Sequence, residues 1–193
     1  MARPRQFDEA EVLDRAMQVF CAHGYDGASM MALASAMGLA GPSVYAAFGS
    51  KRGLFEAVLD RHIACEGEQR DRILSAPTAR AVAERWLFEA ADRLPGVTPA
   101  GSVLILGGLS ASPDNGDVPA ALARRRQANE LALWDRLERA KADGDLPADA
   151  DPAALAAFVT VVCDGMVVRA AAGATTADLR KIAVQAMRAW PSA

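Results

Sequence analysis

Hydrophobic positions in this chain recur at the spacing of an α-helix rather than that of a strand. Near the N-terminus, apolar residues lie at positions 12, 13, 16, 17 and 20, the repeat of an amphipathic helix. Asp8 can cap this helix, Glu11 follows at the capping-box spacing, and Phe7 and Val12 can form a hydrophobic staple. Gly24 supplies a left-handed stop. The pattern therefore predicts a first helix between Asp8 and Gly24.

Cap and break residues divide the rest of the chain into further helices. The clearest caps are Ser29, Ser50, Asp151 followed by Pro152, and Thr175 with Asp178. The predicted helices cover 30–37, 41–48, 50–74, 78–94, 102–112, 118–144, 151–173 and 175–190. No segment has strand periodicity. We therefore expect an all-α fold of about nine helices, with a three-helix head in residues 1–50 and a larger helical domain in residues 51–193.

Composition supports this interpretation and excludes several classes of protein. Alanine accounts for 43 of 193 residues, which favours helices. Cys21, Cys65 and Cys163 are far apart and the chain has two histidines, so we expect neither a disulfide framework nor a metal site. No apolar run follows the basic N-terminus, and glycine and proline interrupt the charge-free stretches. We expect a soluble cytoplasmic protein without a cofactor or a membrane contact.

The charge pattern changes the first impression given by net charge. The formal net charge is −3, whereas a basic domain would be the simple argument for nucleic-acid binding. However, the 29 residues from Gly27 to Phe55 contain no acidic side chain. One face of the head could therefore meet a polyanion.

The same window has the pattern of a helix-turn-helix. Gly38 stands at the turn, where a positive φ is needed, and Ala34 is small where two helices must cross closely. The shared apolar face consists of Leu33, Met37, Leu39 and Val44. In such a motif the second helix enters the major groove of DNA.

The flanking residues make the motif specific. The segment from Phe7 to Leu59 resembles the tetracycline-repressor (TetR) family of bacterial transcriptional regulators. The matching pieces are Val19-Phe20, Gly24-Tyr25, Ala28-Ser29, Ala34, Gly38-Leu39, Pro42-Ser43-Val44-Tyr45, Phe48-Gly49-Ser50-Lys51 and Leu54-Phe55. The resemblance implies a homodimeric repressor that leaves a pseudo-palindromic operator when a small molecule binds its C-terminal domain.

The resemblance also implies which residues meet DNA. Ser29, Tyr45 and Lys51 should contact phosphate, and the first turn of the recognition helix should approach base edges. Ala46 and Ala47, like Gly41, offer little for direct base reading. We therefore hypothesise that the N-terminal arm supplies specificity from the minor groove. The predicted DNA-binding residues are Arg3, Arg5, Ser29, Gly41, Pro42, Ser43, Tyr45 and Lys51.

The family pocket would lie among the C-terminal helices. Large apolar residues there can line it, although core packing is the alternative for each. The predicted lining is Trp86, Leu106, Leu109, Trp134, Phe158 and Val162. The candidate polar anchors are Arg70, Arg85, Asp164 and Arg169. An apolar pocket with few polar anchors predicts a small lipophilic ligand.

The last two predicted helices have the pattern of a subunit interface. The helix over 151–173 has apolar residues on two faces, so it needs a neighbour on each. The predicted interface residues are Val159, Met166, Ile182, Ala186 and Trp190. A monomer with a thicker core is the alternative.

Three other functions compete with this interpretation. The cysteines could make the chain a thiol or copper sensor. An enzyme is another possibility, but the sequence has no P-loop, GxGxxG or GxSxG motif. A helical protein-binding adaptor is the third, and the acid-free window argues against it.

Overall fold

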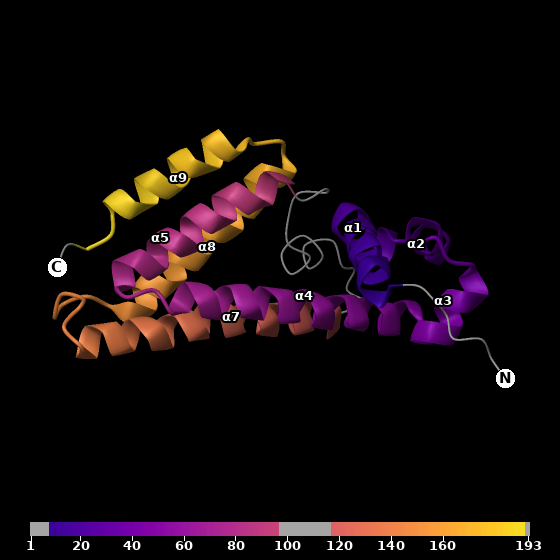
Figure 1. Cartoon of the computed structure of the whole chain (residues 1–193), viewed down its shortest axis with the longest axis horizontal. Helices are drawn as coiled ribbons and strands as arrows, with labels where there is room; N and C mark the ends of the chain where they lie inside the picture. The colour runs from indigo at the N-terminus through magenta and orange to yellow at the C-terminus, as the bar shows by residue number, and fades with distance from the viewer. Residues whose placement is uncertain (1–7, 97–116, 192–193) are drawn as a thin grey trace.

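The computed structural model describes residues 8–96 and 117–191, and these ranges contain helices and connecting turns but no strand. This confirms the all-α prediction. The helices are α1 (Glu9–Gly27), α2 (Met30–Met37), α3 (Gly41–Phe48), α4 (Lys51–Leu74), α5 (Ala79–Arg93), the 3-10 turn η1 (Leu94–Gly96), α7 (Asp117–Ala142), α8 (Pro152–Ala171) and α9 (Thr176–Arg188). Figure 1 shows α1–α3 at one end of an elongated molecule. The predicted helix over 102–112 lies outside the described residues.

Local capping sets the helix starts, as the sequence predicts. The predicted N-caps each accept a backbone N–H from their own first turn: Asp8, Ser29, Ser50, Asp151 and Thr175. Thr175 and Asp178 form a complete capping box. The first helix ends later than predicted. Gly24 forms a kink with φ 68° and ψ 177°, and the helix continues to Gly27.

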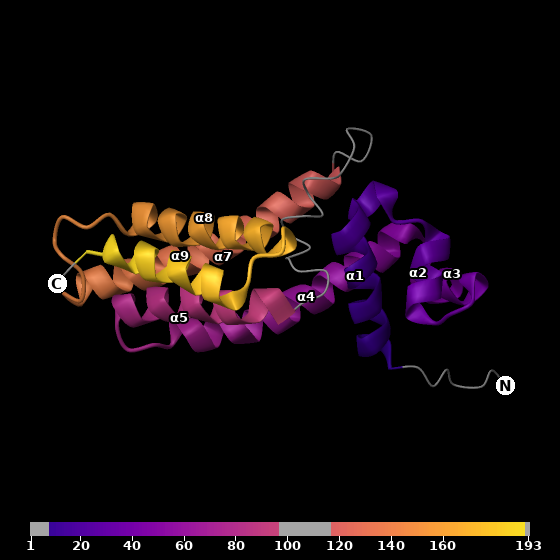
Figure 2. The ribbon, with the colours of Figure 1, turned by 90° about the horizontal axis from the view of Figure 1, so that it is seen from above.

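Two hydrophobic clusters organise the described chain. The head cluster joins α1, α2, α3 and the first turns of α4; its α4 members are Leu54, Phe55, Val58 and Leu59. The bundle cluster joins the remaining helices and includes Ile73 near the other end of α4. At 1.5 Å per residue, the 24 residues of α4 extend about 36 Å. The single helix α4 therefore connects the two clusters, and the head cluster extends past residue 50 (Figure 2).

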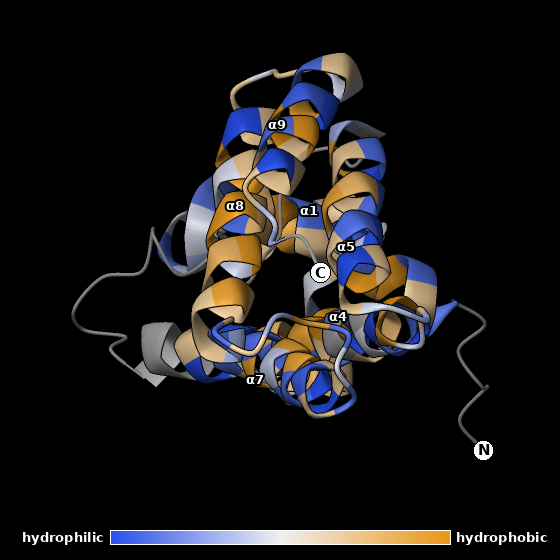
Figure 3. Cartoon of the chain, turned by 90° about the vertical axis from the view of Figure 1, so that its left-hand side faces the viewer, coloured by the Kyte–Doolittle hydropathy of each residue, from blue (hydrophilic) through white to orange (hydrophobic). Residues whose placement is uncertain are grey.

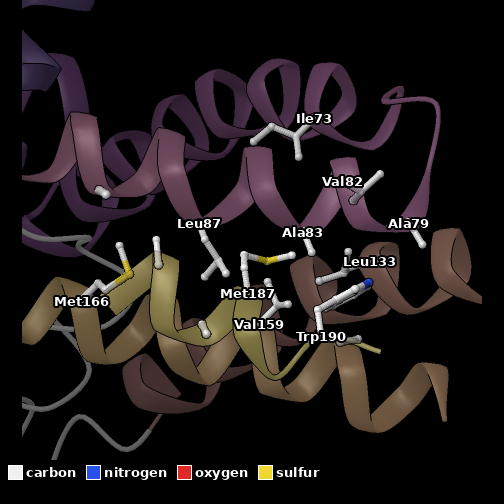
Figure 4. Packing of buried hydrophobic residues seen from close by; sticks show 14 of the residues in the cluster. Ile73, Ala79, Val82, Ala83, Leu87, Leu133, Val159, Met166, Met187 and Trp190 are labelled. Carbon is white, nitrogen blue, oxygen red and sulfur yellow. The ribbon is translucent and has the colours of Figure 1, made fainter. Parts of the chain in front are cut away.

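In the bundle, α5 packs on α8 and α9, and α7 packs on α8. Figure 4 shows Leu87 of α5 and Met187 of α9 pointing toward each other, with Val159 of α8 close by. All three side chains are buried. These contacts hold α5, α8 and α9 together as one body.

The inward face of α7 differs from the sequence interpretation. Helical periodicity over 118–144 predicts Leu131 and Trp134 on the inward side together with Leu137 and Ala140, but Trp134 is 37% exposed and Leu131 is more exposed still. The buried positions are Leu133, Leu137 and Ala140. Because leucine and tryptophan occur on two faces of α7, periodicity alone could not identify the face that α8 covers.

Helix α8 is unusually apolar. By length and composition it is the one described helix that could cross a membrane by itself, with a mean hydropathy of 1.8. It packs against α5, α7 and α9, and Figure 3 shows hydrophobic residues along most of its length. Its packing in the bundle accounts for one apolar face, and exposed Val161 and Val168 mark a second.

Candidate nucleic-acid interface and internal cavity

The pair α2 and α3 has the geometry of a helix-turn-helix. The two helices are bent by 94° relative to each other, within the usual range of this motif. Gly38 adopts the left-handed conformation at the turn, with φ 67° and ψ 27°, and its N–H donates to the carbonyls of Ala34 and Ser35. Leu33 and Val44 are fully buried beneath the pair. The predicted turn and its apolar face are therefore confirmed.

The outer positions of this motif carry most of the residues predicted to meet DNA. Tyr45 is 51% exposed, and Ser29 and Pro42 are also exposed, while Gly41 and Ser43 are half-buried. Because α2 and α3 contact each other, these positions belong to one compact unit. Arg3 and Arg5 lie outside the described residues.

Ser29 has a defined structural role at the start of α2. Its hydroxyl oxygen accepts the N–H of Ala32 at 3.1 Å. The start of a helix carries exposed N–H groups and a partial positive charge, which suits a phosphate. This geometry is compatible with the phosphate contact that the family resemblance implies.

Lys51 connects the end of α1 to the start of α4. Its Nζ donates to the carbonyl of Asp26 at 3.1 Å and lies 4.8 Å from the centre of the Tyr25 ring. Burial lowers the pKa of Lys51, and the charge of Asp26 acts in the opposite direction. The contact uses one of three ammonium donors. Lys51 therefore has a structural role in addition to the predicted phosphate contact.

Two further contacts fix the head on α4. Arg61 of α4 donates two hydrogen bonds of 2.7 Å to the carboxylate of Asp14 on α1. At Gly53, in the first turn of α4, an added Cβ would overlap the carbonyl oxygen of Phe48. Glycine is thus required for the close approach of α3 and α4. Both contacts make the position of the head depend on α4.

A cavity of about 490 Å³ lies between α4, α5, α7 and α8, in the size range of small-molecule sites. Its described lining is Gln69, Arg70, Ile73, Trp86, Ala90, Arg93, Leu94, Ala123, Arg126, Gln127, Asn129, Glu130, Thr160, Val161, Cys163, Asp164 and Val167. Of the predicted lining this set includes Trp86, and of the candidate anchors Arg70 and Asp164. The wall is more polar than the sequence predicted.

The other predicted pocket residues lie elsewhere. Phe158 and Val162 are partly buried against the bundle cluster. The indole N–H of Trp134 donates to Glu138 on the outer side of α7. Arg85 and Arg169 are exposed and are not among the lining residues. Leu106 and Leu109 lie outside the described residues.

Burial changes the chemistry of the cavity wall. It raises the pKa of the Cys163 thiol to about 12. Burial also raises the pKa of Asp164; Arg126 opposes this effect and Glu130 adds to it. A thiol with so high a pKa is a poor nucleophile at neutral pH, which weighs against Cys163 as a reactive sensor. In the described ranges no group of three His, Cys, Asp or Glu could hold a metal ion.

The residues predicted for the subunit interface are core residues of their own chain. Val159 and Met166 are fully buried, Ala186 and Trp190 are buried, and Ile182 packs against the bundle cluster. A side chain with no exposed surface cannot contact another subunit, which corrects the prediction for Val159 and Met166. The large apolar side chains that α8 and α9 expose are Val161, Val168 and Val184. Of the two apolar stripes that the sequence pattern indicates on α8, the one that carries Val159 and Met166 is therefore the buried one.

Sequence reasoning missed several residues of both sites. Gly53 could have been noticed as a glycine inside a predicted helix. The periodicity of the helix over 118–144 predicts Arg126 on its solvent side, and no sequence signal marks Arg93 as a cavity residue. Their place in the cavity wall depends on how α5 and α7 pack.

Comparisons with known proteins agree with this geometry. The family model described as "Bacterial regulatory proteins, tetR family" matches residues 12–58. The chain is 35% identical over 199 residues to the HTH-type transcriptional repressor ComR of Escherichia coli (strain K12), covering 98% of this chain and 91% of ComR. It is 32% identical over 162 residues to the HTH-type regulator YezE of Bacillus subtilis (strain 168), covering 82% and 84%.

A solved structure extends the similarity to the whole fold. A cysteine mutant of the TetR family transcriptional regulator CifR, complexed with a 26-bp double-strand operator DNA, superposes with a TM-score of 0.91 at 39% identity. The match covers 98% of this chain and 100% of that chain. The chain therefore belongs to the TetR family of bacterial transcriptional regulators, which are DNA-binding proteins and not enzymes.

Proposed function

We propose that this regulator is a homodimeric repressor that binds a pseudo-palindromic double-stranded operator and releases it when a small molecule enters the bundle cavity. Residues 1–50 form the DNA-binding head in this proposal, and residues 51–193 bind the ligand and the second copy. Such a protein acts in the cytoplasm, where it reaches DNA. The observation that carries the proposal is the single helix α4, which joins a helix-turn-helix head to a bundle with a cavity.

DNA recognition would use the exposed side of α2 and α3. The start of α2 at Ser29 and the exposed hydroxyl of Tyr45 suit phosphate contacts. The first turn of α3, from Gly41 to Ser43, would approach the base edges. In the CifR complex the bound partner is a double-strand operator, which supports the same use of the head here.

A second copy would cover the exposed apolar face of α8 and α9. On α8 this face includes Val161, Gly165 and Val168, and none of the three is charged. On α9 the exposed large apolar side chain is Val184. A two-fold axis through this face would give an interface of four helices, and two heads that match two operator half-sites.

Ligand binding would act through α4. Gln69, Arg70 and Ile73 of α4 line the cavity. At the other end of the same helix, the head cluster contains Leu54, Phe55, Val58 and Leu59. A molecule that favours a different position of α4 would shift the population toward dimers whose heads no longer match major grooves about 34 Å apart. The apolar side chains of Ile73, Trp86 and Leu94 favour a ligand with lipophilic surface.

Electrophoretic shift on the DNA upstream of the chain's own coding sequence tests the proposed repressor. We expect a specific complex whose affinity falls by roughly a thousandfold between about 50 and 200 mM salt, because phosphate contacts release counterions. No specific complex with any upstream fragment would contradict the proposal. Deleting residues 1–6 tests Arg3 and Arg5: unchanged affinity and selectivity would remove the arm from the mechanism.

Light scattering tests the interface. Val161→Asp should convert the dimer to a monomer, because it places a charge on the face that the partner would cover. Leu131→Asp, on the exposed side of α7, is the matched control and should remain a dimer. Dissociation of both variants, or of neither, would argue against this face.

A further inference from the structure

The bundle cavity has an apolar floor and a charged rim. Ile73, Leu94 and Val167 are buried members of the bundle cluster that face the cavity. Trp86 and Ala90 of α5 pack beside them. The five charged lining residues are Arg70, Arg93, Arg126, Glu130 and Asp164. A ligand that fits both parts must be amphipathic.

Three of the five charged residues interact with one another: Arg126, Glu130 and Asp164. Arg126 attracts Asp164, and Glu130 interacts with the same carboxylate. Arg126 and Glu130 are four residues apart on α7, so their side chains lie on the same helix face. Arg126 therefore offsets one of the two negative charges, and burial raises the pKa of Asp164, which opposes its ionisation. At most one negative charge of this group is left uncompensated, against the two positive charges of Arg70 and Arg93.

The other two arginines have weaker partners. Arg70 donates to the neutral side-chain oxygen of Asn129 at 3.2 Å, and its ion pair with exposed Asp71 is long at 3.3 Å. Arg93 forms no ion pair with any described residue. A guanidinium has five donors in a planar fork that matches a carboxylate. The cavity therefore presents two arginines, Arg70 from α4 and Arg93 from α5, each with guanidinium N–H donors available for a ligand.

Building on the proposed function, we propose that the effector is a small amphipathic anion whose carboxylate binds Arg70 and Arg93 and whose apolar body lies on the floor of Ile73, Leu94 and Val167. The anion replaces the neutral partner of Arg70 with a charged one. Since Arg70 belongs to α4, binding of the carboxylate acts on the helix that carries the DNA-binding head.

Three probes with one hydrocarbon chain test the proposal on the full-length protein: decanoate, decanol and decylammonium. Calorimetric titration should give decanoate an affinity at least tenfold above that of decanol, because one charge-assisted hydrogen bond contributes about that factor. Decylammonium should bind more weakly than decanol. Decanoate should also release the operator in an electrophoretic shift.

Two variants assign the head-group site. Arg93→Gln and Arg70→Gln should each weaken decanoate binding at least tenfold and leave decanol binding unchanged. Arg85→Gln, on the same helix as Arg93 but outside the cavity, is the matched control and should bind decanoate normally. Arg93 is exposed, so its replacement should not disturb folding, and circular dichroism checks this for each variant.

The outcomes separate this inference from the proposed function. Operator binding without any probe tests the regulator itself. If the protein binds the operator but binds decanol as tightly as decanoate, the carboxylate contributes nothing to binding. The proposed anionic effector is then wrong, and a purely lipophilic effector is the alternative. Preference for decylammonium would assign the site to Glu130 and Asp164 instead. Normal decanoate binding by both arginine variants would also overturn the assignment.

Discussion

The head and the bundle solve different packing problems. The head cluster is small and closed: Phe20, Tyr25 and Phe55 stack edge to face or in parallel, with centroids 4.9–6.2 Å apart. The bundle cluster is larger, and a half-open cavity with a polar wall lies beside it. A cavity destabilises a folded bundle, because the side chains around it lose packing contacts. The packing of the head therefore favours one fixed shape, whereas the bundle has room for a ligand.

Leu87→Ala should give the largest effect on stability. Leu87 is fully buried at the centre of the bundle, and truncating such a leucine costs about 2–5 kcal/mol. Calorimetric melting should show the bundle transition at a lower temperature. A loss of stability below about 1 kcal/mol would contradict a tightly packed bundle core, because it would mean that the core collapses around the gap.

Gly53→Ala should damage the head while leaving the bundle folded. The new methyl group would overlap the Phe48 carbonyl, and overpacking costs about 1–3 kcal/mol. Operator affinity should fall at least tenfold, measured by electrophoretic shift, with nearly normal helical content. Gly67→Ala is the matched control on α4, because its Cβ would meet only Arg70 Nη2 at 3.9 Å. Equal operator affinity of the two variants would contradict the role of Gly53.

Tyr45→Phe should produce a moderate effect that is confined to DNA binding. The ring is half exposed, so removal of the hydroxyl should not change the melting temperature. The loss of one phosphate hydrogen bond, about 0.5–1.5 kcal/mol, should weaken operator binding between twofold and about tenfold. Fluorescence anisotropy with a labelled operator measures it. An unchanged dissociation constant would remove Tyr45 from the interface.

Thiol reactivity distinguishes the two regions without any mutation. Burial raises the pKa of Cys21 in the head to about 11 and that of Cys163 in the bundle to about 12. At pH 8 about one Cys21 in a thousand, and about one Cys163 in ten thousand, is a thiolate. Exposed Cys65 should therefore react first with a colorimetric disulfide reagent. Cys21 and Cys163 should both react faster as pH rises toward their pKa values. Rapid reaction of Cys163 at pH 8 would revive the thiol-sensor alternative.

Local sequence signals predict much of the fold. Ser29, Gly38 and Ser50 each act through atoms within a few residues of themselves, so their roles can be predicted from the sequence without knowing the neighbours. The helix-turn-helix and its turn follow from such signals. The cavity and the outward-facing side of α8 could not be predicted in this way, because they depend on which helix covers which side.

By itself the sequence determined that the chain is helical, where most helices begin, and that its head resembles a DNA-binding family. Only the tertiary structure decided that Val159 belongs to the core while Val161 faces outward. It also placed Arg93 and Arg126 in a cavity wall and made Gly53 a point of contact between α3 and α4. The physical reason is that helical periodicity determines which residues share a face. The neighbour that each face meets is set by the packing of segments far apart in the chain.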